Sequence, residues 1–305
     1  MEISGSERRG LGLLCGLFGY TRQAYYGQFR EAGKDAASAY LVLAEVVRIR
    51  KVQKRIGGRK LHHMLAGFME EHSLMMGRDG FFDLLREHQM LVRRRRSRKP
   101  RTTYSGYWMK RHSNLAKEFI PMAANQLWVS DITYVRVGEG FAYLSLVTDA
   151  YSRKIVGFCL SRDLTARGCV EALRMAFAGN CETDGLIHHS DRGLQYYSSR
   201  YMKLLKRHSV RVSMSEKSDP LENAIAERVN GILKDELLEK RFESFARAHR
   251  EVAEAVSIYN NLRPHLSIDM LTPAEAHSMQ HGSLKRRWKN YYASKRSRFT
   301  VQASA

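Results

Sequence analysis

The chain has 305 residues, with 51 Lys and Arg against 31 Asp and Glu and a formal net charge of +20 at pH 7. A hydrophobic content of 44% and only 5 prolines exclude a disordered chain, and the length is sufficient for two separately packed domains. The positive charge favours nucleic acid as the partner; an anionic lipid surface or an ordinary, highly charged soluble protein is the alternative.

The cysteines and the apolar stretches indicate the compartment. Cys15, Cys159, Cys169 and Cys181 form no C-x-x-C pair, so reduced and packed thiols are expected. No apolar stretch approaches the length of a membrane span, and the polar start MEISGSERRG is unlike a signal peptide. The sequence therefore predicts a cytoplasmic protein that makes no membrane contact.

Residues 1–91 are predicted to form a helical DNA-binding region. Over residues 11–29, an apolar helix is followed by a break at Gly19-Tyr20 and by Thr21, a residue suited to cap a second helix. This order is typical of a helix-turn-helix, whose second helix presents its first residues to the base edges of DNA. The residues expected to face the groove are Arg22, Gln23 and Tyr26. A plain helical hairpin is the alternative.

Further helices are expected over about 37–52, 58–72 and 78–88, separated by glycine breaks. The last two could form a second helix-turn-helix within about 58–90, with Arg78 opening its recognition helix. A basic linker is expected over 92–120. Its arginines that would follow a phosphate backbone are Arg93, Arg94, Arg95 and Arg96. A solvated linker is the alternative for this run.

The pattern changes to strands and helices over residues 121–281. The runs LWVSDITYVRV (127–137) and FAYLSLVTDAYSRKIVGFCL (141–160) predict three antiparallel strands. A helix, a buried strand, a helix, a short strand and two further helices follow. This order describes an α/β fold, with a mixed five-stranded sheet flanked by helices. Residues 282–305 are predicted to be a basic tail that contacts DNA or simply frays.

Three carboxylates lie where they could converge. Asp131 lies inside the first strand, Asp191 closes the apolar run GLIHHSDRG (185–193), and Glu227 lies on the helical run ENAIAERVNGILKDELL (222–238). Each alone has an ordinary explanation: a core aspartate, a turn cap or an exposed helix glutamate. Together, oxygen ligands from two strands and a helix favour Mg²⁺ or Mn²⁺.

Two such ions would suit chemistry on a phosphodiester, because a metal pair stabilises both the attacking and the leaving oxygen of a displacement at phosphorus. We therefore expect two ions held by the three acids. Asp131 is the expected bridge between them, from its position on the central strand.

Seven motifs in a fixed order extend this interpretation. They are W-x-x-D-I-T-Y (128–134), V-T-D-A-Y-S-R-K-I-V-G (147–157), H-S-D-R-G-x-Q-Y (189–196), S-M-S (213–215), E-N-A-x-A-E (222–227), Y-N-x-x-R-P-H (259–265) and T-P-A-E-A (272–276). On these motifs, residues from about 126 to 275 resemble the catalytic core of retroviral integrases and DDE transposases. The resemblance is greatest to the transposases that the second reading frame of many bacterial insertion sequences encodes.

The resemblance implies a ribonuclease-H-like core with Asp131, Asp191 and Glu227 as the catalytic triad. It also implies that Lys234 contacts the DNA end, and that Arg263 and His265 either support the core or touch DNA. One departure is Glu222, where the family more often has an aspartate before Asn-Ala. The A-x-A-E context fits Glu227 better as the third acid.

The implied activity is that of a DNA transposase, which cleaves the ends of its element and transfers strands with Mg²⁺ or Mn²⁺. Its implied partners are the terminal inverted repeats, target DNA, further copies of the chain and an upstream-frame product as a fusion partner. Two other functions stay open from the residues. One is a ribonuclease-H-like nuclease or junction resolvase, and the other is a catalytically silent DNA-binding regulator of transposition.

Overall fold

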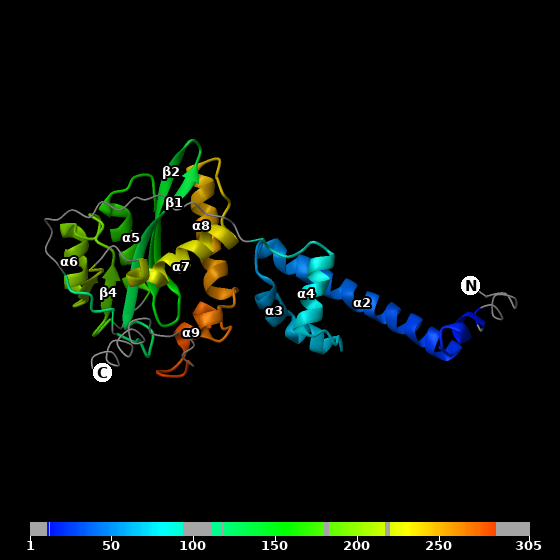
Figure 1. Ribbon diagram of the computed structural model, residues 1–305. Helices are drawn as coiled ribbons and strands as arrows, with labels where there is room; N and C mark the ends of the chain where they lie inside the picture. The colour runs from blue at the N-terminus through cyan, green and yellow to red at the C-terminus, as the bar shows by residue number, and fades with distance from the viewer. Residues whose placement is uncertain are drawn as a thin grey trace, which may run out of the picture. The chain divides into compact units, whose positions relative to one another are not determined.

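The residues described by the computed structural model are 11, 13–93, 112–117, 119–179, 183–216 and 220–284 (Figure 1). Residues 1–52 and 61–91 belong to one compact unit, and residues 53–60 and 92–305 belong to a second. In the part of the chain that is described, no helix combines the length and the apolar character needed to cross a membrane.

Among the described residues of the first unit, a short helix over 13–17 and a turn lead into α2 (Arg22–Val52). Gly19 takes φ +72°, a left-handed conformation that glycine adopts without steric cost. Thr21 Oγ1 accepts the amide N–H of Ala24 at 3.0 Å. Thr21 is therefore the helix cap that the sequence predicts.

α2 is one helix of 31 residues, so the prediction of a separate helix starting near residue 37 was wrong. The stretch contains Gly27 and Gly33 but no proline. Each glycine costs a helix interior only about 1 kcal/mol, which the remaining residues can offset. The second helix of the expected helix-turn-helix is thus much longer than that motif requires.

This unit also contains α4 (Arg78–Glu87) and, from residue 61 on, α3 (Gly58–Glu71); residues 72–77 join the two helices. The imidazole ring of His62 packs edge-on against Phe81, with 5.4 Å between ring centroids. Buried apolar side chains on the three helices are Val42, Val46, Ile49, Leu61, Leu65, Phe81 and Leu85. α4 opens at Arg78, as the sequence predicts.

The second unit is built on a five-stranded sheet in the order β3-β2-β1-β4-β5. Its strands are β1 (Leu127–Val137), β2 (Gly140–Asp149), β3 (Ile155–Ser161), β4 (Ile187–Ser190) and β5 (Arg211–Met214). β1, β2 and β3 pair antiparallel, whereas β4 runs parallel to both β1 and β5. The predicted mixed sheet of five strands is confirmed.

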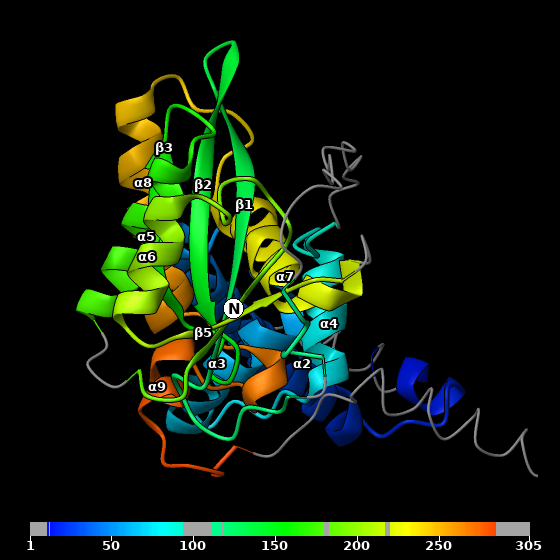
Figure 2. The same cartoon turned by 90° about the vertical axis from the view of Figure 1, so that its left-hand side faces the viewer.

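Helices cover both faces of this sheet. α5 (Ala166–Ala178) and α6 (Ser199–Arg207) lie on one side, and α7 (Ala224–Ile232) and α8 (Phe245–Asn261) lie on the other (Figure 1). Side chains along β1 point alternately to the two faces of the sheet, so the strand contributes to the hydrophobic core on each face. Trp128 packs in the core on the α5 side, and Val135 packs in the core on the α7 and α8 side. The arrangement is ribonuclease-H-like, and α7 runs beside β1 (Figure 2).

The helical run that carries Glu227 is interrupted, whereas the sequence predicted one helix over 222–238. A 3₁₀ turn (Pro220–Asn223) precedes α7 and a π-helical turn (Leu233–Leu237) follows it. In the π turn, the N–H of Leu238 donates to the carbonyl of Leu233 at 2.8 Å, which accommodates one extra residue. The last described elements are a 3₁₀ turn (Leu266–Ile268) and α9 (Pro273–Ser278).

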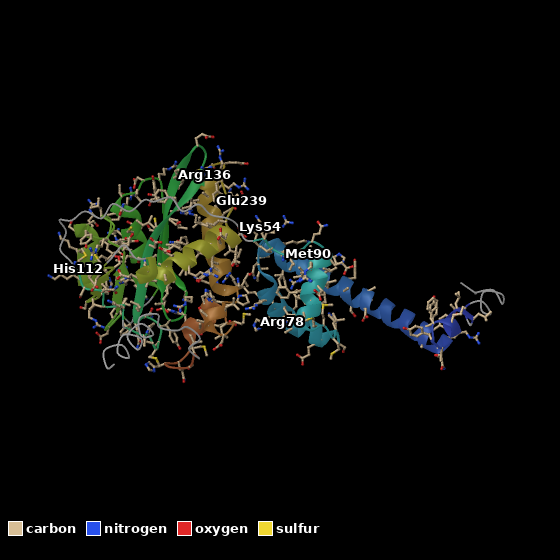
Figure 3. The ribbon with its side chains drawn as sticks, viewed as in Figure 1. Lys54, Arg78, Met90, His112, Arg136 and Glu239 are labelled. Atoms are coloured by element: carbon tan, nitrogen blue, oxygen red, sulfur yellow. The ribbon has the colours of Figure 1, made fainter. Side chains whose placement is uncertain are left out.

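The segment 53–60 was expected in the helical region but belongs to the second unit. Gln53 is 2% exposed, and its Nε2 donates to the carbonyl of Leu262 at 3.1 Å. Lys54 lies beside Glu239, with 3.9 Å between Nζ and Oε1 (Figure 3). Polar contacts of this kind do not change the spacing of hydrophobic residues. The sequence therefore did not show that residues 53–60 belong to the second unit.

Candidate active site

Strand register brings Asp131 and Asp191 together. β1 and β4 are parallel, with Ser130 paired to Ser190, so each aspartate is the next residue beyond a paired position. β4 ends at Ser190, whereas β1 continues to Val137. The two acids therefore lie where the pairing of β1 with β4 ends, and beyond this point that edge of β1 is not paired with β4.

Glu227 lies on α7, between two side chains that tie the helix to β1. Before it, Asn223 Nδ2 donates to the carbonyl of Ser130 at 2.9 Å. After it, Asn230 Nδ2 donates to Asp131 Oδ2 at 2.7 Å. The charge of Glu227 is close enough to raise the pKa of Asp131. Asp191 and Glu227 are thus both within electrostatic range of Asp131.

Burial and mutual repulsion make ionisation of the aspartates unfavourable. Burial raises the pKa of Asp131 to about 7, and the charge of Asp191 adds to this, although hydrogen bonds from Asn230 and the Ile132 N–H oppose it. Burial also raises the pKa of Asp191, against a hydrogen bond from the Gly193 N–H. A bound cation would relieve both costs.

The donor set fits a hard divalent cation that shares its ligands with a substrate. Among the described residues, no three His, Cys, Asp or Glu side chains form a ready metal cage. Mg²⁺ commonly binds through one or two carboxylates plus waters and substrate phosphates, so a closed cage is not required. Each carboxylate oxygen of Asp131 accepts one hydrogen bond from the protein, and each has a further lone pair for a metal.

Asn230 and Thr133 are site residues that the sequence interpretation missed. Asn230 is 5% exposed and lies three residues after Glu227, on the same face of α7. Thr133 Oγ1 accepts from Lys234 Nζ at 3.2 Å, two residues along β1 from Asp131. The i, i+3 spacing from Glu227 was the available signal for Asn230.

Lys234 lies within electrostatic range of Asp131. Burial lowers the pKa of its ammonium, while the charges of Asp235 and Asp131 raise it. Its place in the π turn is not simply two α-helical turns beyond Glu227, because the turn accommodates an extra residue.

Two neutral histidines hold the strands beneath the site. His188 Nε2 lies 2.8 Å from both Ser130 Oγ and Tyr201 Oη, and burial lowers its pKa to about 3. His189 Nδ1 lies 2.8 Å from Ser213 Oγ, and burial lowers its pKa to about 4. These contacts give both side chains a role in joining β1, β4 and β5.

Arg263 and His265 lie in the interior, at 2% and 7% exposure. The guanidinium of Arg263 donates to Glu236, and burial lowers the pKa of His265 to about 2. Of the two roles considered, support of the core agrees with these positions and a DNA contact does not. Asp149 accepts from the N–H and O–H of Ser152, both at 2.7 Å.

The expected DNA-contacting residues of the N-terminal region are at the surface. Arg22, Gln23 and Tyr26 are exposed on the first turns of α2, with Tyr26 38% exposed. Arg93 is also exposed. Arg94, Arg95 and Arg96 lie outside the described residues.

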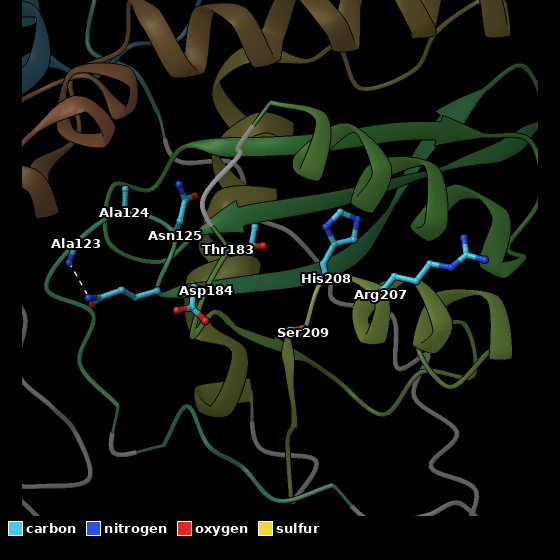
Figure 4. Close-up of a pocket in the computed structure, with 9 residues that line it drawn as sticks. Ala123, Ala124, Asn125, Thr183, Asp184, Arg207, His208 and Ser209 are labelled. Carbon is cyan, nitrogen blue, oxygen red and sulfur yellow. Dashed lines mark hydrogen bonds between the residues drawn. The ribbon is translucent and has the colours of Figure 1, made fainter.

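A surface pocket lies elsewhere on the second unit (Figure 4). Residues that line it include Asn125, Thr183, Asp184, Arg207 and His208. These positions precede β1, β4 and β5, whereas Asp191 follows the opposite end of β4. The pocket is therefore separate from the three acids.

Two family models match the second unit. Residues 121–220 match one described as Integrase core domain, and residues 208–273 match another with the same description. Together the matched residues contain Asp131, Asp191, Glu227 and Lys234.

Relatives with sequence similarity come from bacterial insertion sequences. The uncharacterized 31 kDa protein of insertion element IS600 from Shigella sonnei is 32% identical over 273 residues, which is 88% of this chain and 98% of that protein. The transposase of IS904 from Lactococcus lactis is 34% identical over 56% of this chain and 68% of its own length. Transposase InsF of IS3A from Escherichia coli is 40% identical over 41% of this chain and 43% of its own.

Proposed function

The chain belongs to the integrase-core transposases of bacterial insertion sequences, and we propose that Asp131, Asp191 and Glu227 are its catalytic residues. One observation carries this proposal furthest. β1 and β4 are parallel, with Ser130 opposite Ser190. Asn230 on α7 donates a hydrogen bond from Nδ2 to Asp131 Oδ2. This register and this hydrogen bond support a site at which Asp131, Asp191 and Glu227 act together.

We propose that these carboxylates hold two divalent ions, Mg²⁺ or Mn²⁺, with Asp131 contributing to both. Bound there, the ions would stabilise the attacking and leaving oxygens of an in-line displacement at phosphorus. The raised pKa values of Asp131 and Asp191 support the proposal, because a cation offsets the cost of ionising them.

The chain's own polar groups orient the acids. Asn230 and the Ile132 N–H fix the Asp131 carboxylate at 2.7 and 2.9 Å, and the Gly193 N–H fixes Asp191 Oδ1 at 2.9 Å. These hydrogen bonds would hold the acids in fixed positions for the reaction. Such preorganisation reduces the rearrangement that the reaction would otherwise require. The reaction would be cleavage at the element end, followed by attack of the freed 3′-hydroxyl on target DNA.

DNA contacts are proposed on both units. Lys234 would bind a phosphate of the element end, beside Asp131. The exposed Arg22, Gln23 and Tyr26 would read the terminal inverted repeats, and the arginines from Arg93 to Arg96 would follow the backbone. Because two element ends have to meet, we propose a homo-oligomer on DNA, with an upstream-frame product as a fusion partner. The proposed organisation is a helical region 1–91, a linker 92–120, a core 121–281 and a tail 282–305.

The contact of Lys234 with phosphate predicts a change in salt dependence. Lys234→Ala should weaken binding to an element end and reduce the slope of log affinity against log salt by about one. Fluorescence anisotropy at several salt concentrations measures both quantities. Lys240→Ala, at an exposed lysine further along the chain, should leave the slope unchanged. An unchanged slope in Lys234→Ala would remove the proposed phosphate contact.

Strand transfer separates the proposal from its rivals. A labelled, pre-cut element end is incubated with the chain, Mg²⁺ or Mn²⁺ and a plasmid. A transposase joins the label to the plasmid, whereas a nuclease or resolvase gives only shorter fragments. A silent regulator binds the end and leaves it intact. Binding without products is repeated with the upstream-frame product fused, and failure there too would exclude catalysis by this chain.

A further inference from the structure

Glu236 is the centre of an ion cluster within the second unit. Arg263 donates through Nε to Oε2 and through Nη2 to Oε1, both at 2.8 Å. Lys60 Nζ lies 3.0 Å from each of the same oxygens. The side chains of Arg263, Lys60 and Glu236 are 2%, 9% and 21% exposed. Segments far apart in the sequence therefore converge on one carboxylate with little access to water.

The charges in this cluster do not balance, which argues against a role limited to stability. Burial raises the pKa of Glu236, but the hydrogen bonds and charges of Arg263 and Lys60 outweigh it and lower the pKa overall. Burial and the charge of Arg263 lower the pKa of Lys60 to about 8. Buried ion pairs stabilise a fold weakly because both partners lose hydration. A second cation on one carboxylate adds to that cost.

The position of Glu236 gives the cluster a second consequence. Glu236 lies in the π turn Leu233–Leu237, which continues directly from the helix that carries Glu227 and Asn230. Lys234, two residues before Glu236, reaches Thr133 on β1 at 3.2 Å. Removing the extra residue of a π turn rotates all that follows by about 100°. After such a rotation, Lys234 could no longer contact Thr133. Glu236 could no longer contact Arg263 and Lys60.

We infer that Glu236 is a positioning residue: held by Arg263 and Lys60, it fixes the π turn and so sets how α7 and Lys234 lie against Asp131 on β1. The inference rests on the proposed function, because its consequence is the alignment of the proposed catalytic groups. It differs from a DNA contact for Arg263, whose guanidinium faces Glu236. Glu236 touches no reacting atom and acts only through the backbone of the turn.

The test compares two substitutions at Glu236 in the full chain. Glu236→Gln removes the charge, and Glu236→Asp keeps it but withdraws the carboxylate by one methylene. We expect both to lower the strand-transfer rate at saturating DNA end by about tenfold to a hundredfold, as for small displacements of catalytic groups. The DNA concentration that gives half the maximal rate should change less than threefold, and the thermal midpoint of Glu236→Asp should stay near the wild-type value.

Glu251→Gln is the matched control. Glu251 accepts from Arg247 at 2.9 Å with 26% side-chain exposure, close to that of Glu236, but on α8. It should keep the wild-type rate. A wild-type rate in Glu236→Asp would overturn the inference, and would do so even if Glu236→Gln failed to fold. No strand transfer in the wild type, with the upstream-frame product fused as well, would instead count against the proposed function itself.

Discussion

Asp131→Asn is expected to reduce strand transfer by at least about a thousandfold while leaving the affinity for an element end within about twofold. A metal at such a site contributes several kcal/mol to transition-state stabilisation, and each 1.4 kcal/mol is a factor of ten in rate. Asparagine keeps the shape of the side chain and an oxygen for Asn230 Nδ2, which now donates to Asp131 Oδ2 at 2.7 Å. The loss should therefore reflect the missing charge rather than misfolding.

Single-turnover joining of a labelled, pre-cut end measures the rate, and anisotropy measures the affinity. Asp184→Asn is the control, since Asp184 is an exposed aspartate at the rim of the separate pocket. It should join ends at the wild-type rate. If Asp131→Asn kept more than a tenth of the wild-type rate, Asp131 would not be an essential metal ligand.

The same substitution should stabilise the metal-free protein above neutral pH. Asp131 has a pKa raised to about 7 by burial and by Asp191, against about 4 in an unfolded chain. The folded state therefore binds this proton more tightly, and the free energy of unfolding falls as pH rises from about 4 to about 7. Asparagine does not titrate, so the free energy of unfolding of the variant does not fall in this way. Above neutral pH it should exceed that of the wild type by about a few kcal/mol, the order expected for such a pKa shift.

Urea denaturation at pH 4 and pH 8 in chelator measures this difference. The two proteins should have similar stability at pH 4, and the variant should be the more stable at pH 8. Adding Mg²⁺ at pH 8 should stabilise the wild type alone, because the ion binds only its folded state. Equal stabilities of the two proteins at pH 8 in chelator would mean that Asp131 is not held in a costly ionised state.

The sequence was sufficient for the sheet, because alternating strands leave a local pattern. Alternation over residues 127–160 predicted the three antiparallel strands, and the structure pairs them that way. The contexts of Asp131, Asp191 and Glu227 predicted their convergence. The parallel register of Ser130 with Ser190 explains it for the two aspartates, but no local pattern encodes that register.

Contacts between residues far apart in the sequence could not be predicted from local patterns. Lys60, Glu236 and Arg263 each look like a surface charge in their own segment, and only the fold shows that they share one site. The π turn also escaped prediction, because nearly all of its residues are ordinary helix formers. α2 shows a different error: two helices were predicted where the structure has one of 31 residues.

Manganese binding tests most directly the claim that Asp131, Asp191 and Glu227 form one metal site. Mn²⁺ is titrated by electron paramagnetic resonance into the chain with a pre-cut end, with DNA alone subtracted. The same titration is made on Asp131→Asn, Asp191→Asn and Glu227→Gln. We predict two ions per chain in the wild type and at least about a tenfold loss of affinity in each variant. The same affinity and stoichiometry in wild type and all three variants would contradict a shared site.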